Sequence, residues 1–373
     1  MVDYEDITMD RMMNAFNARI TGQEETKKKI ASAVYTHYKL LDLNERRKDE
    51  CYVKRHLGNI LVYGPSGSGK TELFRALRDS LDIPVYIVDT PSISNAGYKG
   101  YTISEMLDDF ITVSHGDPEK GILVFDEFDK IIDMANSDIQ GAGYAKSLVN
   151  EFLKLSEGKQ IPCTKDGEEY IWNTADVLMV FIGSFGQLIK EREQKRNEAV
   201  TGFCAHEMKE DKPLTKDLSL KDFLDYGINK EFMGRISLIC HLEGLDKKGL
   251  KNILLHSSNS PLKKYEEMLQ EQNVSVTFSD SAINYMIEAA LALDLGARGL
   301  EKIVDPYMME LLFTIGEKRN LIGHVTLDNL KKNRMPKMKA GDPCAASRRK
   351  SKAFQKVLKA ARAARKENYP FFD

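Results

Sequence analysis

The sequence has few cysteines and no closely spaced pair of them. Its five cysteines are scattered along 373 residues, at positions 51, 163, 204, 240 and 344. An odd number of distant cysteines argues against a disulfide scaffold, and the absence of a Cys-x-x-Cys pair argues against a zinc site. We therefore expect a protein of the reducing cytoplasm.

Long apolar runs are also missing. The longest uncharged apolar stretch, residues 177–189, is interrupted by Gly183, Ser184, Gly186 and Gln187, whereas a membrane-spanning helix needs about 20 residues. The first ten residues, MVDYEDITMD, contain no basic region followed by an apolar core, so no secretory signal is predicted. These absences favour a protein that does not enter a membrane.

The chain has almost no net charge, but its charges are unevenly distributed. The whole sequence has 54 basic and 56 acidic residues, a net charge of −2. Residues 331–373 hold 14 Lys or Arg and 3 Asp or Glu, a net of +11, which leaves −13 for residues 1–330. With 42% apolar and 29% charged residues, the composition is that of a globular protein and excludes a wholly disordered chain.

The hydrophobic pattern predicts an α/β protein. Four short apolar runs read as strands, at residues 59–63, 85–88, 122–125 and 177–182. Helical patterns lie between them, so we expect a parallel sheet covered by helices on both faces. The predicted order is a helical segment at 1–56, an α/β domain at 57–243, a smaller, mostly helical domain at 244–328 and a basic tail at 329–373. In the smaller domain, only residues 274–278 and 324–327 read as strands.

A phosphate-binding loop follows the first predicted strand. The sequence Gly64-Pro65-Ser66-Gly67-Ser68-Gly69-Lys70-Thr71 fits the pattern G-x-x-x-x-G-K-[ST] between a strand and a helix. The glycines allow backbone N–H groups to surround phosphate oxygens, and the helix beginning near Lys70 adds its positive end. Lys70 is expected to reach the β- and γ-phosphates of ATP, and Thr71 to bind Mg²⁺.

A pair of carboxylates completes this motif. Asp126 and Glu127 end the apolar strand at residues 122–125. Asp126 is expected to hold Mg²⁺ with its water shell, and Glu127 to polarise the water that attacks the γ-phosphate. Alone, such a pair is more often a solvated strand end; together with the phosphate loop it predicts an ATP hydrolase that uses ATP and Mg²⁺.

These motifs, with three others, resemble the ClpX branch of the AAA+ ATPases, which are ring-shaped protein unfoldases that feed partner peptidases. The resemblance covers residues 15–328, and its further motifs are Ile20-Thr21-Gly22-Gln23-Glu24 with residues 33–39, Gly227-Ile228-Asn229-Lys230-Glu231-Phe232-Met233-Gly234-Arg235, and Gly296-Ala297-Arg298-Gly299-Leu300. It implies a large AAA+ P-loop domain, a small helical lid domain and a homo-hexamer. The family's amino-terminal zinc domain has no counterpart in this sequence.

The resemblance also assigns roles to single residues. Ile20 and Thr21 match the segment beside the adenine. Arg235 matches the arginine finger, which acts in the neighbouring subunit's ATP site, and Arg298 matches the sensor-2 arginine of the lid domain. Ser184, which follows the strand at 177–182, is the best-placed polar residue for sensor 1.

A polypeptide-gripping loop is implied at Gly97-Tyr98-Lys99-Gly100. It resembles the aromatic pore loop of the family, with Lys99 in place of an apolar residue. A tyrosine between glycines places a large ring on a flexible hinge, which can grip protein substrates without reading their sequence. A second pore loop is expected at residues 137–144.

Two segments depart from the family pattern. Residues 163–170 are acidic overall where the family has a basic Arg-Lys-His loop, so substrate preference is expected to differ. Val200-Thr201-Gly202-Phe203 stands where the family has an aliphatic-Gly-Phe tip that docks on a peptidase. Thr201 reduces the apolar contact area there, and docking on a ClpP-type peptidase is left open.

The basic tail leaves an alternative function open. Phe354, Val357, Leu358 and Ala361 recur at helical spacing, which is compatible with a basic amphipathic helix or with a solvated terminus. Such a tail could bind nucleic acid, as in a nucleic-acid-associated AAA+ loader or remodeller. A third reading is a scaffold that binds ATP and barely hydrolyses it.

Overall fold

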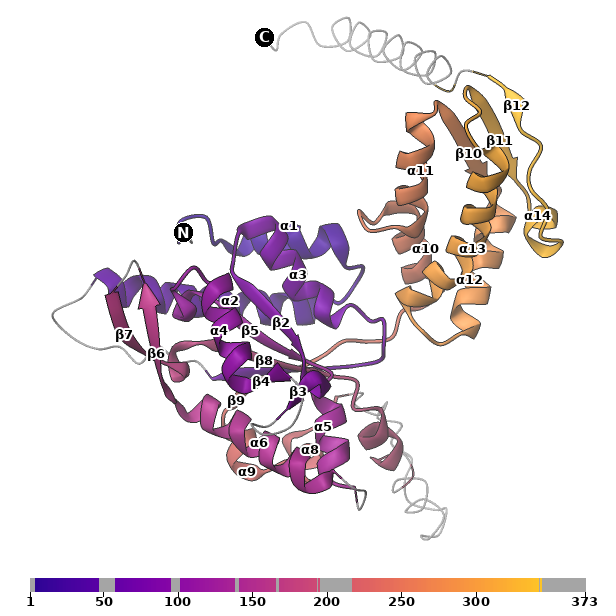
Figure 1. Cartoon of the computed structure of the whole chain (residues 1–373). Coiled ribbons are helices and arrows are strands. Elements are labelled where there is room, and N and C mark those ends of the chain that lie inside the picture. Colours follow the sequence, from indigo (N-terminus) through magenta and orange to yellow (C-terminus); the bar gives the residue numbers. More distant parts are fainter. Residues whose placement is uncertain are drawn as a thin grey trace, which may run out of the picture. The chain divides into compact units, whose positions relative to one another are not determined.

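The computed structural model describes residues 4–46, 58–94, 101–137, 141–165, 168–192, 194, 217–341 and 343. The chain forms two compact units, Met1–Leu245 and Asp246–Asp373, which are described separately. Figure 1 shows the elements of each.

The first unit contains most of the strands. Its strands are β1 (Asn59–Tyr63), β2 (Val85–Asp89), β3 (Ile93–Ser94), β4 (Tyr101–Thr102), β5 (Ile122–Asp126), β6 (Gln160–Lys165), β7 (Glu168–Asn173), β8 (Leu178–Gly183) and β9 (Ile236–His241). Its helices are α1 (Met9–Arg19), α2 (Glu24–Arg46), α3 (Lys70–Leu81), α4 (Ile103–Val113), α5 (Phe128–Ala135), α6 (Ala142–Glu157), α8 (Leu220–Asp225) and α9 (Lys230–Met233).

The main sheet has five strands in the order β2-β5-β8-β1-β9. Every pairing in it is parallel, as the continuous apolar runs predict for strands buried on both faces. The carboxyl ends of β1, β5 and β8 therefore lie at one edge of the sheet, with β8 in the middle. This edge receives the segments that carry the predicted nucleotide site.

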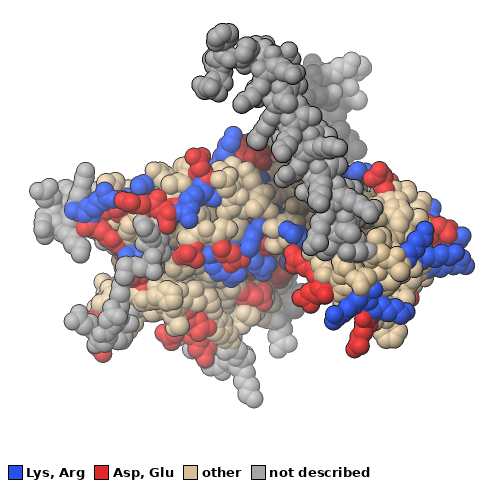
Figure 2. All heavy atoms as spheres, turned by 90° about the horizontal axis from the view of Figure 1, so that it is seen from above, with Lys and Arg blue, Asp and Glu red and all other residues tan. Residues whose placement is uncertain are grey.

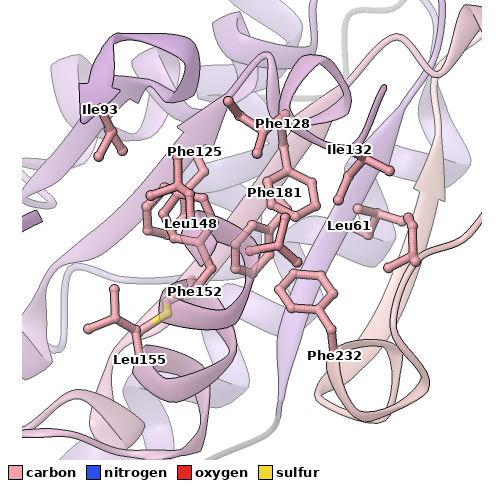
Figure 3. Packing of buried hydrophobic residues seen from close by; sticks show 14 of the residues in the cluster. Leu61, Ile93, Phe125, Phe128, Ile132, Leu148, Phe152, Leu155, Phe181 and Phe232 are labelled. Atoms are coloured by element: carbon pink, nitrogen blue, oxygen red, sulfur yellow. The ribbon is translucent and has the colours of Figure 1, made fainter. Parts of the chain in front are cut away.

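Alternate residues of each strand face two separate hydrophobic clusters. Leu61 and Tyr63 of β1 belong to the cluster formed with α4, α5 and α6, whereas Ile60 and Val62 belong to the cluster formed with α1, α2 and α3. Aromatic rings fill the first cluster (Figure 3): the ring centroids of Phe125 and Phe181 are 5.0 Å apart in a stacked arrangement. The sheet is thus covered on both faces, which fixes the positions of its carboxyl ends.

The second unit is mainly helical. Its helices are α10 (Lys247–His256), α11 (Pro261–Glu271), α12 (Asp280–Ala292), α13 (Ala297–Ile315) and α14 (Leu327–Lys331). A three-stranded sheet joins β10 (Val274–Phe278), β11 (Leu321–Val325) and β12 (Lys339–Ala340). The first two strands are parallel, and β12 pairs antiparallel with β11.

The structure differs from the sequence prediction in several elements. The helical segment predicted at 1–56 is interrupted at residues 20–23, because Gly22 and Gln23 have positive φ angles of 68° and 63°. The strand β9 and the hairpin β6–β7 were not predicted. The predicted start of the tail at residue 329 falls within α14, and β12 extends the second unit's sheet to residue 340; the domain bounds themselves stay a prediction.

No helix among the described residues is long and apolar enough to span a bilayer. On the face shown in Figure 2, acidic and basic side chains of the described residues are interspersed. The charge visible on that face is therefore not gathered into one single-sign patch.

Candidate active site

The phosphate loop connects β1 to α3 at the carboxyl edge of the sheet. Gly64, Gly67 and Gly69 have φ angles of 147°, 71° and 100°, which are accessible to glycine and strained for other residues. Packing also requires glycine at the first position, since a Cβ on Gly64 would lie 2.2 Å from the carbonyl oxygen of Leu242. The backbone of the motif therefore depends on glycine at these positions.

Two polar side chains of the loop are candidates for binding phosphate. The ammonium group of Lys70 lies within the loop and donates to the carbonyl oxygens of Gly64 and Pro65 at 2.7 and 2.8 Å. The hydroxyl of Ser68 is buried and has no hydrogen-bond partner among the described residues. A buried polar atom without a partner carries a free-energy cost that a ligand would relieve. Together with the glycine cradle, this fits a nucleotide phosphate.

The Thr71 hydroxyl donates to Oδ2 of Asp126 at 2.7 Å. These are hard oxygen ligands of the type that Mg²⁺ prefers, and Mg²⁺ usually combines one or two protein ligands with substrate phosphates. Among the described residues no group of three or more His, Cys, Asp or Glu could hold a metal ion alone. The pair thus fits an ion that is shared with the nucleotide.

Glu127 occupies an unusual backbone conformation. It precedes α5 with φ 55° and ψ 31°, and its N–H donates to Oδ1 of Asp126 at 2.9 Å. Its side chain is exposed. A left-handed conformation at a non-glycine residue is strained and is often found at functional sites. The strained backbone marks Glu127 as a candidate functional residue beside Asp126.

Ser184 is tied to a buried carboxylate that the sequence analysis missed. Its hydroxyl donates to Oδ2 of Asp129 at 2.6 Å, and the N–H of Phe185 donates to the same oxygen at 3.0 Å. Asp129 is 2% exposed. It therefore fixes the end of β8 against α5, between the phosphate loop and Glu127. Its position within the motif Asp126-Glu127-Phe128-Asp129-Lys130 was the available signal.

Ile20 lies beside the phosphate loop. A Cβ on Gly69 would be 3.6 Å from Cγ2 of Ile20, which is buried. The buried ammonium group of Lys27 donates to the Ile20 carbonyl at 2.8 Å, to Asn17 at 2.8 Å and to Glu24 at 3.2 Å. The chain reversal at residues 20–23, which includes half-buried Thr21, is thereby fixed in place.

Arg235 lies at the opposite edge of the main sheet. It immediately precedes β9, and its carbonyl accepts a hydrogen bond from Asn59 N–H at 2.9 Å at the beginning of β1. Its guanidinium is 3.3 Å from Oε1 of Glu157, and the two side chains are 44% and 43% exposed. The structure does not bring Arg235 to the phosphate loop of its own chain.

Arg298 belongs to the second unit. It is exposed in the first turn of α13, and a Cβ on neighbouring Gly299 would lie 2.8 Å from the carbonyl of Ala290. The glycine lets α13 pack closely on α12 and so fixes the position of Arg298. A cation is electrostatically unfavourable at a helix amino terminus, which points to a role other than helix stability.

Cys240 of β9 is chemically inert. Burial raises the pKa of its thiol to about 12, so it stays protonated at neutral pH. A protonated, buried thiol is neither a nucleophile nor a metal ligand.

Other predicted functional residues lie outside the described residues. These are Tyr98 and Lys99 of the first pore loop, residues 138–140 of the second, residues 200–203 of the docking segment, and most of the tail. The structure does describe the two ends of the first loop, where β3 and β4 pair through Ile93 with Tyr101 and Ser94 with Thr102.

Comparisons with known proteins agree with this geometry. The profile of the ATPase family associated with various cellular activities (AAA) matches residues 60–199, and that of the C-terminal, D2-small domain of ClpB protein matches residues 245–318. The ATP-dependent Clp protease ATP-binding subunit ClpX of Porphyromonas gingivalis is 30% identical over 340 residues, covering 83% of this chain and 80% of that protein. The ClpX of Borrelia duttonii is 31% identical over 333 residues, covering 84% and 76%.

The chain belongs to the ClpX family of AAA ATPases. The resemblance stated from the motifs is confirmed, as is the fold of a parallel α/β ATPase domain followed by a helical region. Like the family, this member binds nucleotide and hydrolyses ATP.

Proposed function

We propose that this protein is a ring-forming unfoldase or remodelling ATPase that uses ATP hydrolysis to thread polypeptide through a central pore. The observation that carries the proposal is the location of Arg235 at the sheet edge opposite the phosphate loop. An arginine finger so placed serves a neighbouring subunit, and a closed ring supplies every site with one.

Within one subunit, the described residues support a site that binds ATP and Mg²⁺ and positions the attacking water. Lys70 and the backbone N–H groups of residues 66–71 hold the β- and γ-phosphates. Thr71 and Asp126 hold Mg²⁺, which when bound shields the phosphate charge. Glu127 orients the attacking water and accepts its proton.

The remaining predicted residues sense or frame the nucleotide. Ile20 and Thr21 contact the adenine side, and the position of the Ile20 side chain, 3.6 Å from where a Cβ on Gly69 would lie, supports this assignment for Ile20. Ser184 acts as sensor 1 through the hydrogen bond that orients it on Asp129. Arg298 acts as sensor 2 from the second unit. Arg235 completes the site in the next subunit of a homo-hexamer.

Protein substrates are gripped by Tyr98, with Lys99 adding positive charge to the pore. The relatives' names describe the ATP-binding subunit of a Clp protease, which supports a partner peptidase; docking through residues 200–203 stays open. A cytoplasmic location remains a prediction from the cysteine pattern. The nucleic-acid alternative depends on the basic tail, of which the structure describes little.

The test of threading is Tyr98→Ala. We expect ATPase activity within about twofold of the unmodified protein and loss of unfolding of a tagged, folded substrate by at least about tenfold, because truncation removes the aromatic area that holds the chain. Unfolding is measured as loss of fluorescence from a substrate fused to a fluorescent protein.

Tyr98→Phe is the matched control, since it keeps the ring and removes only the hydroxyl. It should retain most unfolding. Equal loss of ATPase and unfolding in Tyr98→Ala would contradict a pulling role, while ATPase stimulation by DNA or RNA that is lost on deleting residues 344–373 would favour the nucleic-acid alternative.

A further inference from the structure

The connection between the two units begins directly beside the nucleotide loop. Residues 242–246 join β9 to α10, and the boundary between the units falls after Leu245. The N–H of Leu242 donates to the carbonyl of Tyr63 at 2.8 Å, which extends the pairing of β9 with β1. A change in the phosphate loop can therefore reach this connection through very few atoms.

The connection also approaches the phosphate loop closely at two glycines. The carbonyl oxygen of Leu242 occupies the space that a side chain on Gly64 would fill, and a Cβ on Gly244 would lie 3.6 Å from Cγ of Pro65. Gly64 thus approaches the backbone of Leu242 closely, and Gly244 lies near the ring of Pro65.

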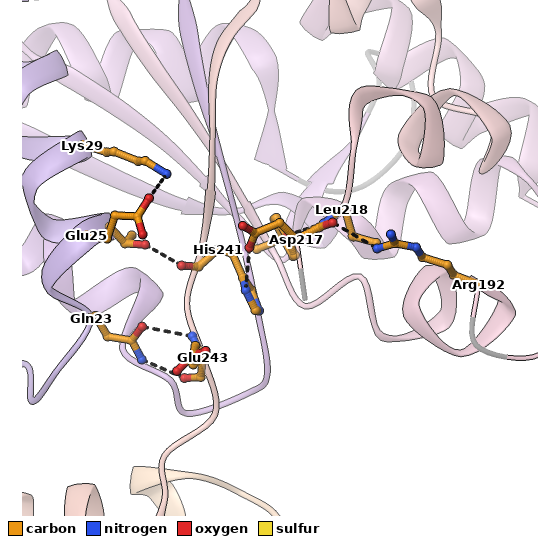
Figure 4. A network of polar contacts seen from close by, with 10 residues as sticks. Gln23, Glu25, Lys29, Arg192, Asp217, Leu218, His241 and Glu243 are labelled. Carbon is orange, nitrogen blue, oxygen red and sulfur yellow. Dashed lines mark hydrogen bonds and ion pairs between the residues drawn. The ribbon is translucent and has the colours of Figure 1, made fainter. Parts of the chain in front are cut away.

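The side chain of Gln23 forms hydrogen bonds with the same connection. Its Nε2 donates to the carbonyl of Glu243 at 2.8 Å, and its Oε1 accepts from the N–H of Glu243 at 3.0 Å (Figure 4). One turn further along α2, the Thr26 hydroxyl donates to the carbonyl of His241. A primary amide can satisfy both backbone groups of a single residue at once, and the Gln23 side chain does so for Glu243.

Gln23 also lies in the same chain reversal as Ile20 and Thr21, the residues predicted to lie beside the adenine. It follows Ile20 and Thr21 in a reversal where Gly22 and Gln23 both have positive φ, a conformation that non-glycine residues rarely adopt. Lys27 fixes the Ile20 carbonyl from the buried side. Gln23 therefore lies three residues from Ile20 in a turn whose Ile20 end is held by Lys27.

We propose that Gln23 is a positioning residue that couples nucleotide binding to the connection leading into the second unit. Nucleotide bound against Ile20 and the phosphate loop fixes the position of the Gln23 side-chain amide. The amide in turn fixes the position of the Glu243 backbone and hence the direction in which α10 begins. This inference depends on nucleotide binding by this ATPase and not on polypeptide threading.

The test uses the full-length chain with two fluorescent labels, one on an exposed position of α4 and one on an exposed position of α11. We expect ADP to shift the transfer efficiency between the labels, and Gln23→Met to reduce that shift by at least about half. The methionine keeps the length of the side chain and removes both hydrogen bonds, whose loss corresponds to roughly a tenfold change in an equilibrium between two arrangements. Gln270→Met, at an exposed position of α11, is the matched control and should leave the shift unchanged.

Affinity for a fluorescent ADP analogue separates positioning from simple binding or folding. We expect it to change less than about threefold in Gln23→Met, while the shift between labels is reduced. A full-sized shift in the variant, or a loss of affinity that by itself accounts for the reduced shift, would overturn the proposal.

Amide hydrogen exchange in the unmodified chain provides a second measurement that needs no variant. Addition of ADP should slow amide exchange in a peptide covering residues 241–247 by at least about threefold, relative to the change in a peptide covering α12. The reason is that the Glu243 N–H donates to the side-chain oxygen Oε1 of Gln23. Exchange in that peptide that does not respond to ADP would overturn the proposal independently. A threading defect in Tyr98→Ala, or its absence, affects neither result.

Discussion

The two edges of the main sheet hold their functional residues in opposite ways. At the carboxyl edge, Thr71 is bonded to Asp126 and Ser184 to Asp129, at 2.7 and 2.6 Å. At the amino edge, Arg235 makes an exposed ion pair with Glu157 at 3.3 Å. The first edge is assembled within the subunit, whereas the second presents a cation at the surface.

This difference separates the residues that act within one subunit from the arginine that is proposed to act in a neighbour. β1 has five residues, and a parallel strand of that length spans roughly 16 Å, so the arginine cannot reach around the sheet to its own phosphate loop. An exposed ion pair contributes about 1 kcal/mol or less. For the proposed action of Arg235 in a neighbour's ATP site, leaving Glu157 would therefore cost little.

The largest expected effect comes from the amino edge. Arg235→Ala should lower kcat for ATP by about 10³-fold, because a trans arginine neutralises charge that develops on the transferred phosphate. ATP affinity of the separate subunit should be nearly unchanged. Steady-state ATPase assays and titration with a fluorescent nucleotide measure the two quantities.

Mixing experiments decide whether Arg235 acts between subunits. Rings mixed from Arg235→Ala and Glu127→Gln subunits contain interfaces where intact Glu127 faces intact Arg235, so activity should reappear. Arg46→Ala, which removes another exposed ion pair, with Asp42, is the control and should have little effect. No recovery in mixed rings would mean that the two edges do not meet across an interface.

A smaller loss is expected at the carboxyl edge. Glu127→Gln should lower kcat by about 10²-fold or more, within the range for removal of a general base, and should leave ATP binding intact because the contact to Asp126 comes from the backbone. The isosteric change Glu157→Gln at the amino edge should alter kcat by less than about twofold. Similar losses in both variants would remove the distinction between the edges.

Much of the carboxyl edge was predictable because its signals are local. Strands buried on both faces produce continuous apolar runs, and the loop motif specifies its own backbone through Gly64, Gly67 and Gly69. Glu127 follows β5 directly, so its position at the edge could be derived from the strand alone.

The amino edge and the supporting contacts were not predictable in the same way. β9 includes Ser237 and His241 among its apolar residues, and its pairing with β1 is a contact between distant parts of the chain. Asp129 supports Ser184 across 55 residues, and Gln23 reaches Glu243 across 220. Neither contact has a periodic signal in the sequence. Asp129 and Gln23 both lie within motifs, but a motif does not specify the distant partner of each side chain.

The smallest expected effect tests whether the carboxyl edge owes its order to Asp129. Asp129→Asn removes the carboxylate charge, so even with its amide oxygen in the place of Oδ2 it accepts more weakly from both the Ser184 hydroxyl and the Phe185 N–H. We expect a loss of about 1–3 kcal/mol in free energy of unfolding and a several-fold fall in kcat, measured by denaturant titration and ATPase assay. Asp328→Asn, in an exposed pair with Lys332, should change stability by less than about 1 kcal/mol. Because Ser184 and Asp129 share one bond, adding Ser184→Ala should cost less in Asp129→Asn than in the unmodified protein; additive losses would show that Ser184 does not act through Asp129.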